Sequence, residues 1–131
     1  MTYNKKLRKT LSFLQIASGM SYIGKKDYVH RELMAKNILI GKQNLCKITG
    51  LSLLAVLKNG KYQAAAETLF PVRWSSVEVM LSKRYSIKSD VWSFGILLTE
   101  IVSNGEEPYK GISQEMPHVD RFDTHFPSPK A

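Results

Sequence analysis

The stretch of sequence that decides the fold covers residues 28–40 and reads YVHRELMAKNILI. Its two ends are short apolar pieces, and between them lie the polar residues His30, Arg31 and Glu32. Asn37 follows Glu32 by five positions, directly before the second apolar piece. Short runs rich in Val, Ile and Tyr are typical of strands. The sequence therefore predicts a polar loop, carrying a carboxylate and an amide, between two strands.

The composition is that of a globular domain. The chain has 131 residues, enough for one domain with its own core, and 44% are hydrophobic, which argues against disorder. The net charge is +8, and its one cluster consists of Lys5, Lys6, Arg8 and Lys9. We interpret this cluster as a solvated helix end. A nucleic-acid binder is the alternative, but the other charges are dispersed and no reader motif is present, so we expect no nucleic-acid partner.

Cysteine usage and hydropathy bear on the compartment. Cys46 is the single cysteine, lies in an apolar run and is expected to be a buried free thiol, which fits a reducing compartment. The polar, basic start predicts no signal peptide. The longest apolar stretch, residues 91–102, is too short to span a bilayer, so no membrane segment is expected. We expect a cytoplasmic location, or the cytoplasmic side of a receptor if the chain belongs to a longer protein.

Apolar spacing predicts two helices. In residues 7–24 apolar side chains recur at helical spacing, and Gly24 is a plausible stop. Residues 86–102 are apolar on nearly every side, which predicts a helix at the buried centre of the domain. Asn104 and Gly105 are expected to end this second helix.

The rest of the chain predicts short strands and irregular segments. Strands are expected at residues 28–29, 38–40 and 45–49, and a turn at 41–44 makes the last two a hairpin. Residues 51–74 show no clean period and are predicted to form a long ordered or semi-ordered loop. Residues 116–131 are expected to be an irregular or disordered tail.

Further motifs follow the opening stretch in order. Residues 70–74 read FPVRW, Glu78 comes next, and residues 88–95 read KSDVWSFG. Together with the opening stretch, they resemble the C-terminal lobe of a protein tyrosine kinase, whose catalytic loop reads H-R-D-L-x-x-x-N. The resemblance covers residues 7–115. It implies that residues 1–115 are a partial kinase catalytic domain. The implied fold is α+β, mostly α, with a short β-hairpin near the catalytic loop and no N-terminal lobe.

The resemblance implies roles in phosphoryl transfer, with ATP and Mg²⁺ as the family's cofactors. Glu32 takes the position of the catalytic base, beside Arg31. Asn37 would hold one magnesium ion and belong to the nucleotide site. Leu39 would lie beneath the adenine of ATP.

A platform for the substrate tyrosine is implied at Pro71, Val72, Arg73 and Trp74. Tyr62 falls where tyrosine kinases carry an activation-loop phosphorylation site, and Arg31 would pair with that phosphate. An unmodified loop tyrosine is the alternative interpretation of Tyr62.

Three further residues are given structural roles by the resemblance. His30 would be a packed residue rather than a base. Asp90 would accept hydrogen bonds from the backbone of the catalytic loop, since a buried carboxylate needs such partners. Glu78 keeps the place of a glutamate whose arginine partner is expected beyond this chain, so we expect Glu78 to be solvated or unpaired.

The departures from the family pattern concern catalysis. Glu32 replaces an aspartate and is one methylene longer. Gly50 stands where the family has its metal-binding aspartate, and magnesium requires oxygen ligands. The chain also has no Gly-rich phosphate loop and no lysine strand. We therefore expect no cofactor for this chain as it stands.

The sequence thus favours a kinase-like chain that is catalytically inactive and acts as an interaction fragment. Protein partners would bind the platform or an apolar face left exposed by truncation, and self-association would follow from the same exposed face. The alternative is that the chain is part of an active tyrosine kinase that uses Glu32 as a longer-armed base.

Overall fold

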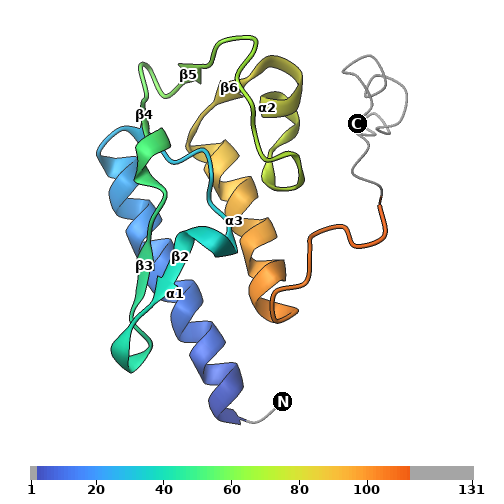
Figure 1. The fold of residues 1–131 in the computed structure, drawn as a ribbon. Helices are drawn as coiled ribbons and strands as arrows, with labels where there is room; N and C mark the ends of the chain where they lie inside the picture. The colour runs from blue at the N-terminus through green and yellow to red at the C-terminus, as the bar shows by residue number, and fades with distance from the viewer. Residues whose placement is uncertain (1–2, 113–131) are drawn as a thin grey trace, which may run out of the picture.

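A computed structural model describes residues 3–112 of the chain (Figure 1). Its longest elements are the helices α1 (Tyr3–Lys25) and α3 (Ile87–Val102), with a shorter helix α2 (Val77–Ser82) before α3. The predicted class is confirmed, because the described part is mostly helical with small antiparallel strand pairs. The predicted tail at 116–131 lies outside the described residues.

Six strands of two or three residues form three separate antiparallel pairs in the described part. The pairs are β1 (Tyr28–Val29) with β4 (Ala55–Val56), β2 (Ile38–Ile40) with β3 (Cys46–Ile48), and β5 (Tyr62–Gln63) with β6 (Arg84–Tyr85). Single turns of 3₁₀ helix lie at Ala35–Asn37, Lys42–Asn44, Leu51–Leu53 and Val72–Trp74. These short elements connect the two long helices.

Helix α1 is longer than its apolar spacing predicted, because it begins at Tyr3 and continues past Gly24 to Lys25. The predicted stop at Gly24 is confirmed to within one residue, because the helix ends at Lys25. A Cβ atom on Gly24 would lie 3.3 Å from Ile87 Cδ1, so this glycine gives close packing against α3. The chain reverses at Asp27, whose φ of 60° is left-handed.

The predicted β-hairpin is confirmed. Strands β2 and β3 pair Ile38 with Ile48 and Ile40 with Cys46. The turn between them places Gln43 and Asn44 at left-handed φ values of 57° and 58°. The cysteine is only half-buried, so the expectation of a buried thiol is wrong. It lies at the end of a two-stranded pair that has no further strand beside it in the described residues.

The segment 51–74 is more regular than the predicted loop. It holds strands β4 and β5, each paired with a strand distant in the sequence. Backbone hydrogen bonds also hold this segment in place. The Leu57 N–H donates to the Asp27 carbonyl at 2.7 Å, and the Ala64 N–H donates to the Lys83 carbonyl at 3.0 Å. The segment is therefore ordered, as predicted, but its two short strands were not predicted, because strands of two residues are too short to leave a period in the sequence.

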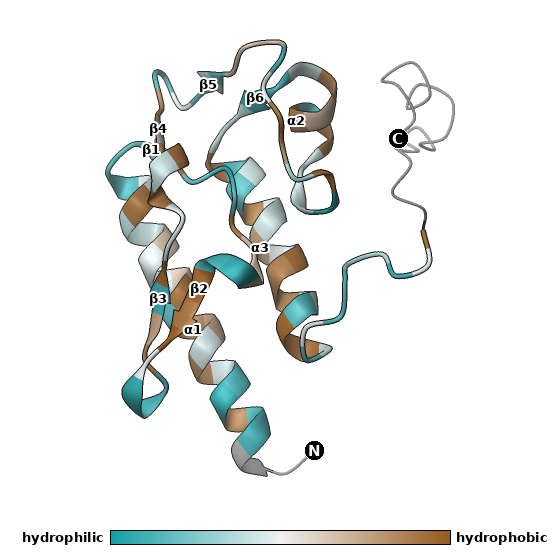
Figure 2. Cartoon of the chain, viewed as in Figure 1, coloured by the Kyte–Doolittle hydropathy of each residue, from teal (hydrophilic) through white to brown (hydrophobic). Residues whose placement is uncertain are grey.

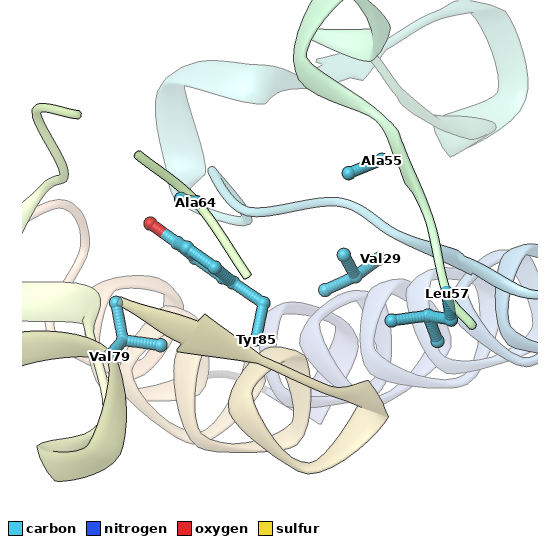
Figure 3. Close-up of a cluster of buried hydrophobic side chains, with 6 residues drawn as sticks. All are labelled: Val29, Ala55, Leu57, Ala64, Val79 and Tyr85. Carbon is cyan, nitrogen blue, oxygen red and sulfur yellow. The ribbon is translucent and has the colours of Figure 1, made fainter. Parts of the chain in front are cut away.

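Two buried clusters make up the core. One joins Ile16 of α1, Leu97 of α3 and Leu33 of residues 30–37, which are called the catalytic-loop segment below. The second lies around the short strands and consists of Val29, Ala55, Leu57, Ala64, Val79 and Tyr85 (Figure 3). Helix α3 begins with a capping box, in which the hydroxyl of Ser86 accepts the backbone N–H of Ser89 and the hydroxyl of Ser89 accepts the backbone N–H of Ser86. The first cluster also takes in partly buried residues of β2 and β3, so it fixes α3 against α1 and the hairpin.

Helix α3 is not buried on every side, contrary to the prediction. Figure 2 shows its predominantly hydrophobic colouring, yet Val91, Trp92 and Val102 are exposed. Only some of its faces are covered by α1, the catalytic-loop segment and the 3₁₀ turn Val72–Trp74. The predicted end is confirmed: the Gly105 N–H donates to the Glu100 carbonyl at 2.7 Å, with left-handed φ at Asn104 and Gly105. No helix among the described residues is long and apolar enough to span a membrane.

Leu97 gives a test of the first core cluster. Its side chain is 0% exposed, so Leu97→Ala removes buried methyl groups and leaves a cavity. We expect the free energy of unfolding to fall by about 2–5 kcal/mol, measured by urea denaturation. Leu69→Ala is the matched control, because Leu69 is 94% exposed and its loss should change stability by less than about 0.5 kcal/mol. Equal effects of the two substitutions would contradict the assigned core.

Candidate functional site

The backbone of the catalytic-loop segment is held by one buried carboxylate from α3. Asp90 Oδ2 accepts the His30 N–H at 2.7 Å, and Asp90 Oδ1 accepts the Arg31 N–H at 3.1 Å. Burial raises the pKa of this carboxyl above its ordinary value, while the two backbone hydrogen bonds act in the opposite direction. These are the bonds that the resemblance implies for an aspartate at this position.

His30 is fully buried and both ring nitrogens are engaged. Nδ1 accepts the Glu32 N–H at 3.1 Å, so in the neutral ring the proton is on Nε2. Nε2 then donates to the Thr49 carbonyl at 2.7 Å. A ring with no free nitrogen and no exposed surface is suited to positioning the loop, and not to accepting a substrate proton.

The side chain of Arg31 extends from the catalytic-loop segment to two tyrosines. Its φ is 76°, and its Nε donates to the Leu53 carbonyl at 2.7 Å. The guanidinium carbon is 5.1 Å from the centre of the Tyr62 ring and 5.6 Å from that of Tyr85, within cation–π distance. Tyr62, the candidate phosphorylation site, is thus brought beside the arginine that would pair with its phosphate.

Asn37 closes the far end of the same loop. Its Nδ2 donates to the Glu32 carbonyl at 2.7 Å, and its own carbonyl accepts from Thr49 N–H and Oγ1 at 2.7 and 2.9 Å. The Glu32 side chain is half-buried, and Leu39 on β2 is exposed. The structure therefore brings Glu32 and Asn37 together, five residues apart, around one carbonyl.

The residues present do not complete the magnesium site of the family. Asn37 would supply the amide oxygen that the catalytic-loop asparagine of the family gives to one magnesium ion, but Gly50 offers no side-chain oxygen at the position of the metal-binding aspartate. Gly50 has a left-handed φ of 73°, and a Cβ atom there would lie 2.8 Å from Asn37 Cγ. A side chain at this position would displace Asn37. Within residues 3–112, no group of three or more His, Cys, Asp or Glu could hold a metal ion.

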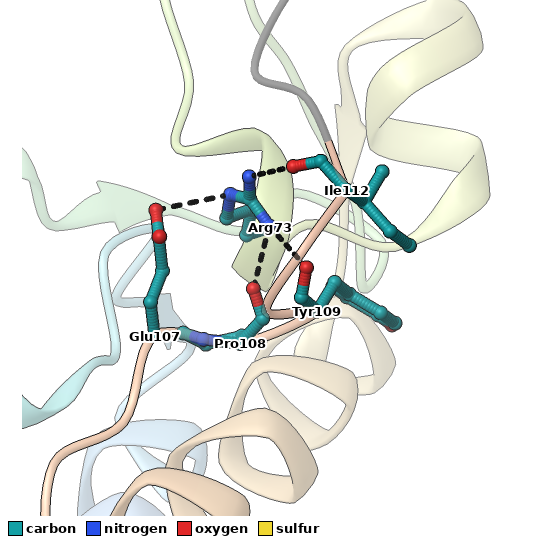
Figure 4. Close-up of polar contacts among 5 residues, drawn as sticks. All are labelled: Arg73, Glu107, Pro108, Tyr109 and Ile112. Carbon is teal, nitrogen blue, oxygen red and sulfur yellow. Dashed lines mark hydrogen bonds and ion pairs between the residues drawn. The ribbon is translucent and has the colours of Figure 1, made fainter.

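The platform residues are fixed from two directions. Trp74 Nε1 donates to Glu100 Oε1 at 2.6 Å, and the Trp74 carbonyl accepts from Ser93 Oγ at 2.6 Å, so α3 holds the 3₁₀ turn. Arg73 faces the segment after α3 (Figure 4), where it donates to the carbonyls of Pro108, Tyr109 and Ile112 at 2.6, 3.0 and 2.6 Å. It also forms an ion pair with Glu107 at 3.3 Å.

Comparison with known proteins decides the family. The model of the family described as protein tyrosine and serine/threonine kinase matches residues 3–129. The chain belongs to the protein kinase family, in its tyrosine kinase group. It is 47% identical over 109 residues to tyrosine-protein kinase SRK3 of Spongilla lacustris, an alignment that covers 82% of this chain and 33% of that protein. It is 46% identical over 99 residues to tyrosine-protein kinase SRK2 of the same organism, covering 76% and 27%. The chain spans about a third or less of these relatives.

Glu100 is a site residue of this kinase chain that the sequence reasoning missed. It is buried, and its Oε1 accepts both Trp74 Nε1 and the Ala35 N–H at 3.0 Å. One carboxylate thus joins the platform to the catalytic-loop segment. An acidic residue within an otherwise apolar helix was the available signal, because a buried acid requires hydrogen-bond partners.

The remaining predicted residues lie at the edges of the site. Glu78 is exposed in the first turn of α2, as expected for a solvated carboxylate. Pro71 and Val72 are half-buried beside Arg73 and Trp74. The structure therefore holds the backbone of residues 30–37 and the 3₁₀ turn Val72–Trp74 through side chains of α3, and Gly50, beside Asn37, has no side chain.

Tyr85, 3% exposed beneath Arg31, gives a pH test of this framework. Burial is the main cause that raises the pKa of its phenol above 10.0, the ordinary value expected in the unfolded chain. Above pH 10 the unfolded chain therefore loses the proton first. The contribution of the Tyr85 phenol to the free energy of unfolding is complete below that pH and is lost as the pH rises through the pKa of the folded state.

We expect urea denaturation between about pH 9 and about pH 11 to show a steeper loss of stability in the wild type than in Tyr85→Phe. Tyr22→Phe, at an exposed ring, is the control and should retain the wild-type slope. An unchanged slope in Tyr85→Phe would contradict the burial assigned to this phenol.

Proposed function

We propose that this chain is a catalytically inactive, kinase-related binding module that recognises protein segments through its substrate platform. Gly50 is the observation that carries the proposal. It supplies no oxygen at the place of the metal-binding aspartate, and a side chain there would meet Asn37. The chain is accordingly proposed to work without ATP or Mg²⁺.

The requirements of phosphoryl transfer support inactivity. The reaction depends on positioning and on neutralising the charge of the phosphates, and metal ions supply much of that neutralisation. Asn37 contributes only a neutral amide here. At the position of the base, Glu32 has a side chain one methylene longer than aspartate, and small errors in placing a reacting group are costly.

The rigidity of the platform supports a binding role. Trp74 and Arg73 are held by side-chain hydrogen bonds that do not involve the metal or nucleotide positions. A surface that is already ordered loses little entropy when a partner binds. We propose that the partner presents a tyrosine to Val72 and its neighbours, and that Tyr62 is phosphorylated by another kinase and then pairs with Arg31. The exposed apolar residues Val91 and Trp92 provide a second protein contact or a self-association surface.

Two further aspects belong to this proposal. The half-buried, unbridged Cys46 supports a reducing, cytoplasmic location. No nucleic-acid partner is proposed, because the basic residues are dispersed along the sequence.

The second candidate is that the chain is part of an active tyrosine kinase, with Glu32 as the base and Asn37 on one magnesium ion. The relatives that carry the name tyrosine-protein kinase favour this candidate, since the chain spans 33% and 27% of their length.

A single-turnover assay with Mg-ATP and a tyrosine peptide separates the two candidates when it is run on the protein as it is expressed, with any segments that flank this chain. We expect no phosphopeptide above the level of Glu32→Gln, because the metal-binding carboxylate is replaced, whereas active kinases turn over at about 1–100 s⁻¹. A phenylalanine version of the peptide controls for phosphorylation elsewhere. Phosphopeptide that depends on both Glu32 and the tyrosine would overturn the inactive assignment.

A further inference from the structure

A small cavity lined by charged and hydroxyl-bearing residues lies between the catalytic-loop segment, α2 and α3. Its volume is about 10 Å³, and Arg31, Ser76, Val79 and Asp90 are among the residues that line it. This is about the volume that one water molecule needs inside a protein. The cavity is therefore too small for an organic ligand and large enough for a single water.

The hydroxyl of Ser76 is the group that this cavity leaves unexplained. Ser76 is 1% exposed, and its Oγ is the only buried side-chain nitrogen or oxygen in the described residues for which no hydrogen-bond partner is found. The other serines of the lining have partners, because Ser75, Ser89 and Ser93 donate to carbonyls at 2.7, 2.6 and 2.6 Å. Buried hydroxyls in folded proteins are almost always hydrogen-bonded, to protein or to water.

The charges around the cavity select a neutral occupant. The carboxylate of Asp90 disfavours an anion, and the guanidinium of Arg31 disfavours a cation. Each oxygen of Asp90 accepts one backbone N–H, and a carboxylate has capacity for further donors. Burial raises the pKa of this carboxyl, so one more donor would stabilise its charged form. The occupant must both donate and accept.

We propose that the cavity is a binding site for one structural water molecule, which accepts from the Ser76 hydroxyl and donates to the Asp90 carboxylate. The water joins Ser76, two residues beyond the platform, to Asp90, which holds the catalytic-loop backbone. The water thereby couples the platform to the catalytic-loop segment.

Ser76→Ala distinguishes a hydrated cavity from a dry one by the sign of its effect. If water is bound, the substitution removes one of its partners, and we expect the equilibrium constant for unfolding to rise by about fivefold. If the cavity is dry, the substitution removes an unpaired hydroxyl and the constant falls. Ser82→Ala is the matched control, because its exposed hydroxyl bonds to the Glu78 carbonyl at 2.8 Å and Ser82 does not line this cavity.

Oxygen-17 magnetic relaxation dispersion provides a second measurement that detects water oxygen directly. The wild type should contain one more long-lived water than Ser76→Val, whose larger side chain fills the cavity. Equal numbers of long-lived waters, or a lower unfolding constant in Ser76→Ala, would overturn the proposal. Stabilisation of the wild type, but not of Ser76→Ala, by sodium over choline chloride would show a bound cation in place of water and would also overturn it.

Discussion

The carboxylate of Asp90 is the interaction on which the rest of the site depends. It lies on the first turn of α3 and accepts backbone N–H groups from His30 and Arg31, sixty and fifty-nine positions earlier in the chain. A carboxylate removed from water is stable only when donors replace the lost solvent. Because those donors belong to the backbone, the loop is held whichever side chains it carries. His30 in turn hydrogen-bonds to the Thr49 carbonyl, and the Thr49 N–H donates to the Asn37 carbonyl.

Glu100 repeats this device two to three turns later on the same helix. Its carboxylate accepts the Ala35 N–H and the indole N–H of Trp74. Helix α3 therefore holds the loop at His30 and again at Ala35, and it holds the platform at Trp74. Neither Asp90 nor Glu100 depends on the nucleotide or the metal. The hydrogen bonds of both carboxylates are made within the chain, so the loop and the turn Val72–Trp74 keep their geometry without any contribution from Gly50. This is the physical basis on which the proposed function separates recognition from catalysis.

The sequence predicted the parts of the fold that have local causes. The β2–β3 hairpin and the end of α3 depend on turn residues close to them, such as Asn44 and Gly105, and both were confirmed. Strand β1 was predicted at residues 28–29 and is confirmed. Strands β4, β5 and β6 are too short to leave a periodic pattern, and the pairs β1–β4 and β5–β6 are fixed by distant partners. The exposure of Val91 and Trp92 likewise depends on which elements cover α3, and no property of the helix itself records that.

The same distinction applies to the site. Asp90 and His30 were singled out through the resemblance, whereas Glu100 and the partners of Arg73 were missed. Arg73 was expected on the platform, but its guanidinium binds carbonyls between positions 108 and 112. A platform motif alone cannot show where an arginine on it is directed, because the partners are backbone atoms that any residue supplies.

Amide hydrogen exchange of His30 and Arg31 tests the central claim most directly. If Asp90 holds the loop, both amides should exchange only through global unfolding, with the same opening free energy as the amide of Leu97 in α3. In Asp90→Asn, where one acceptor oxygen is replaced by an amide donor, their protection relative to Leu97 should fall by about tenfold or more. Wild-type exchange of both amides at the rates of exposed loop residues would contradict the account.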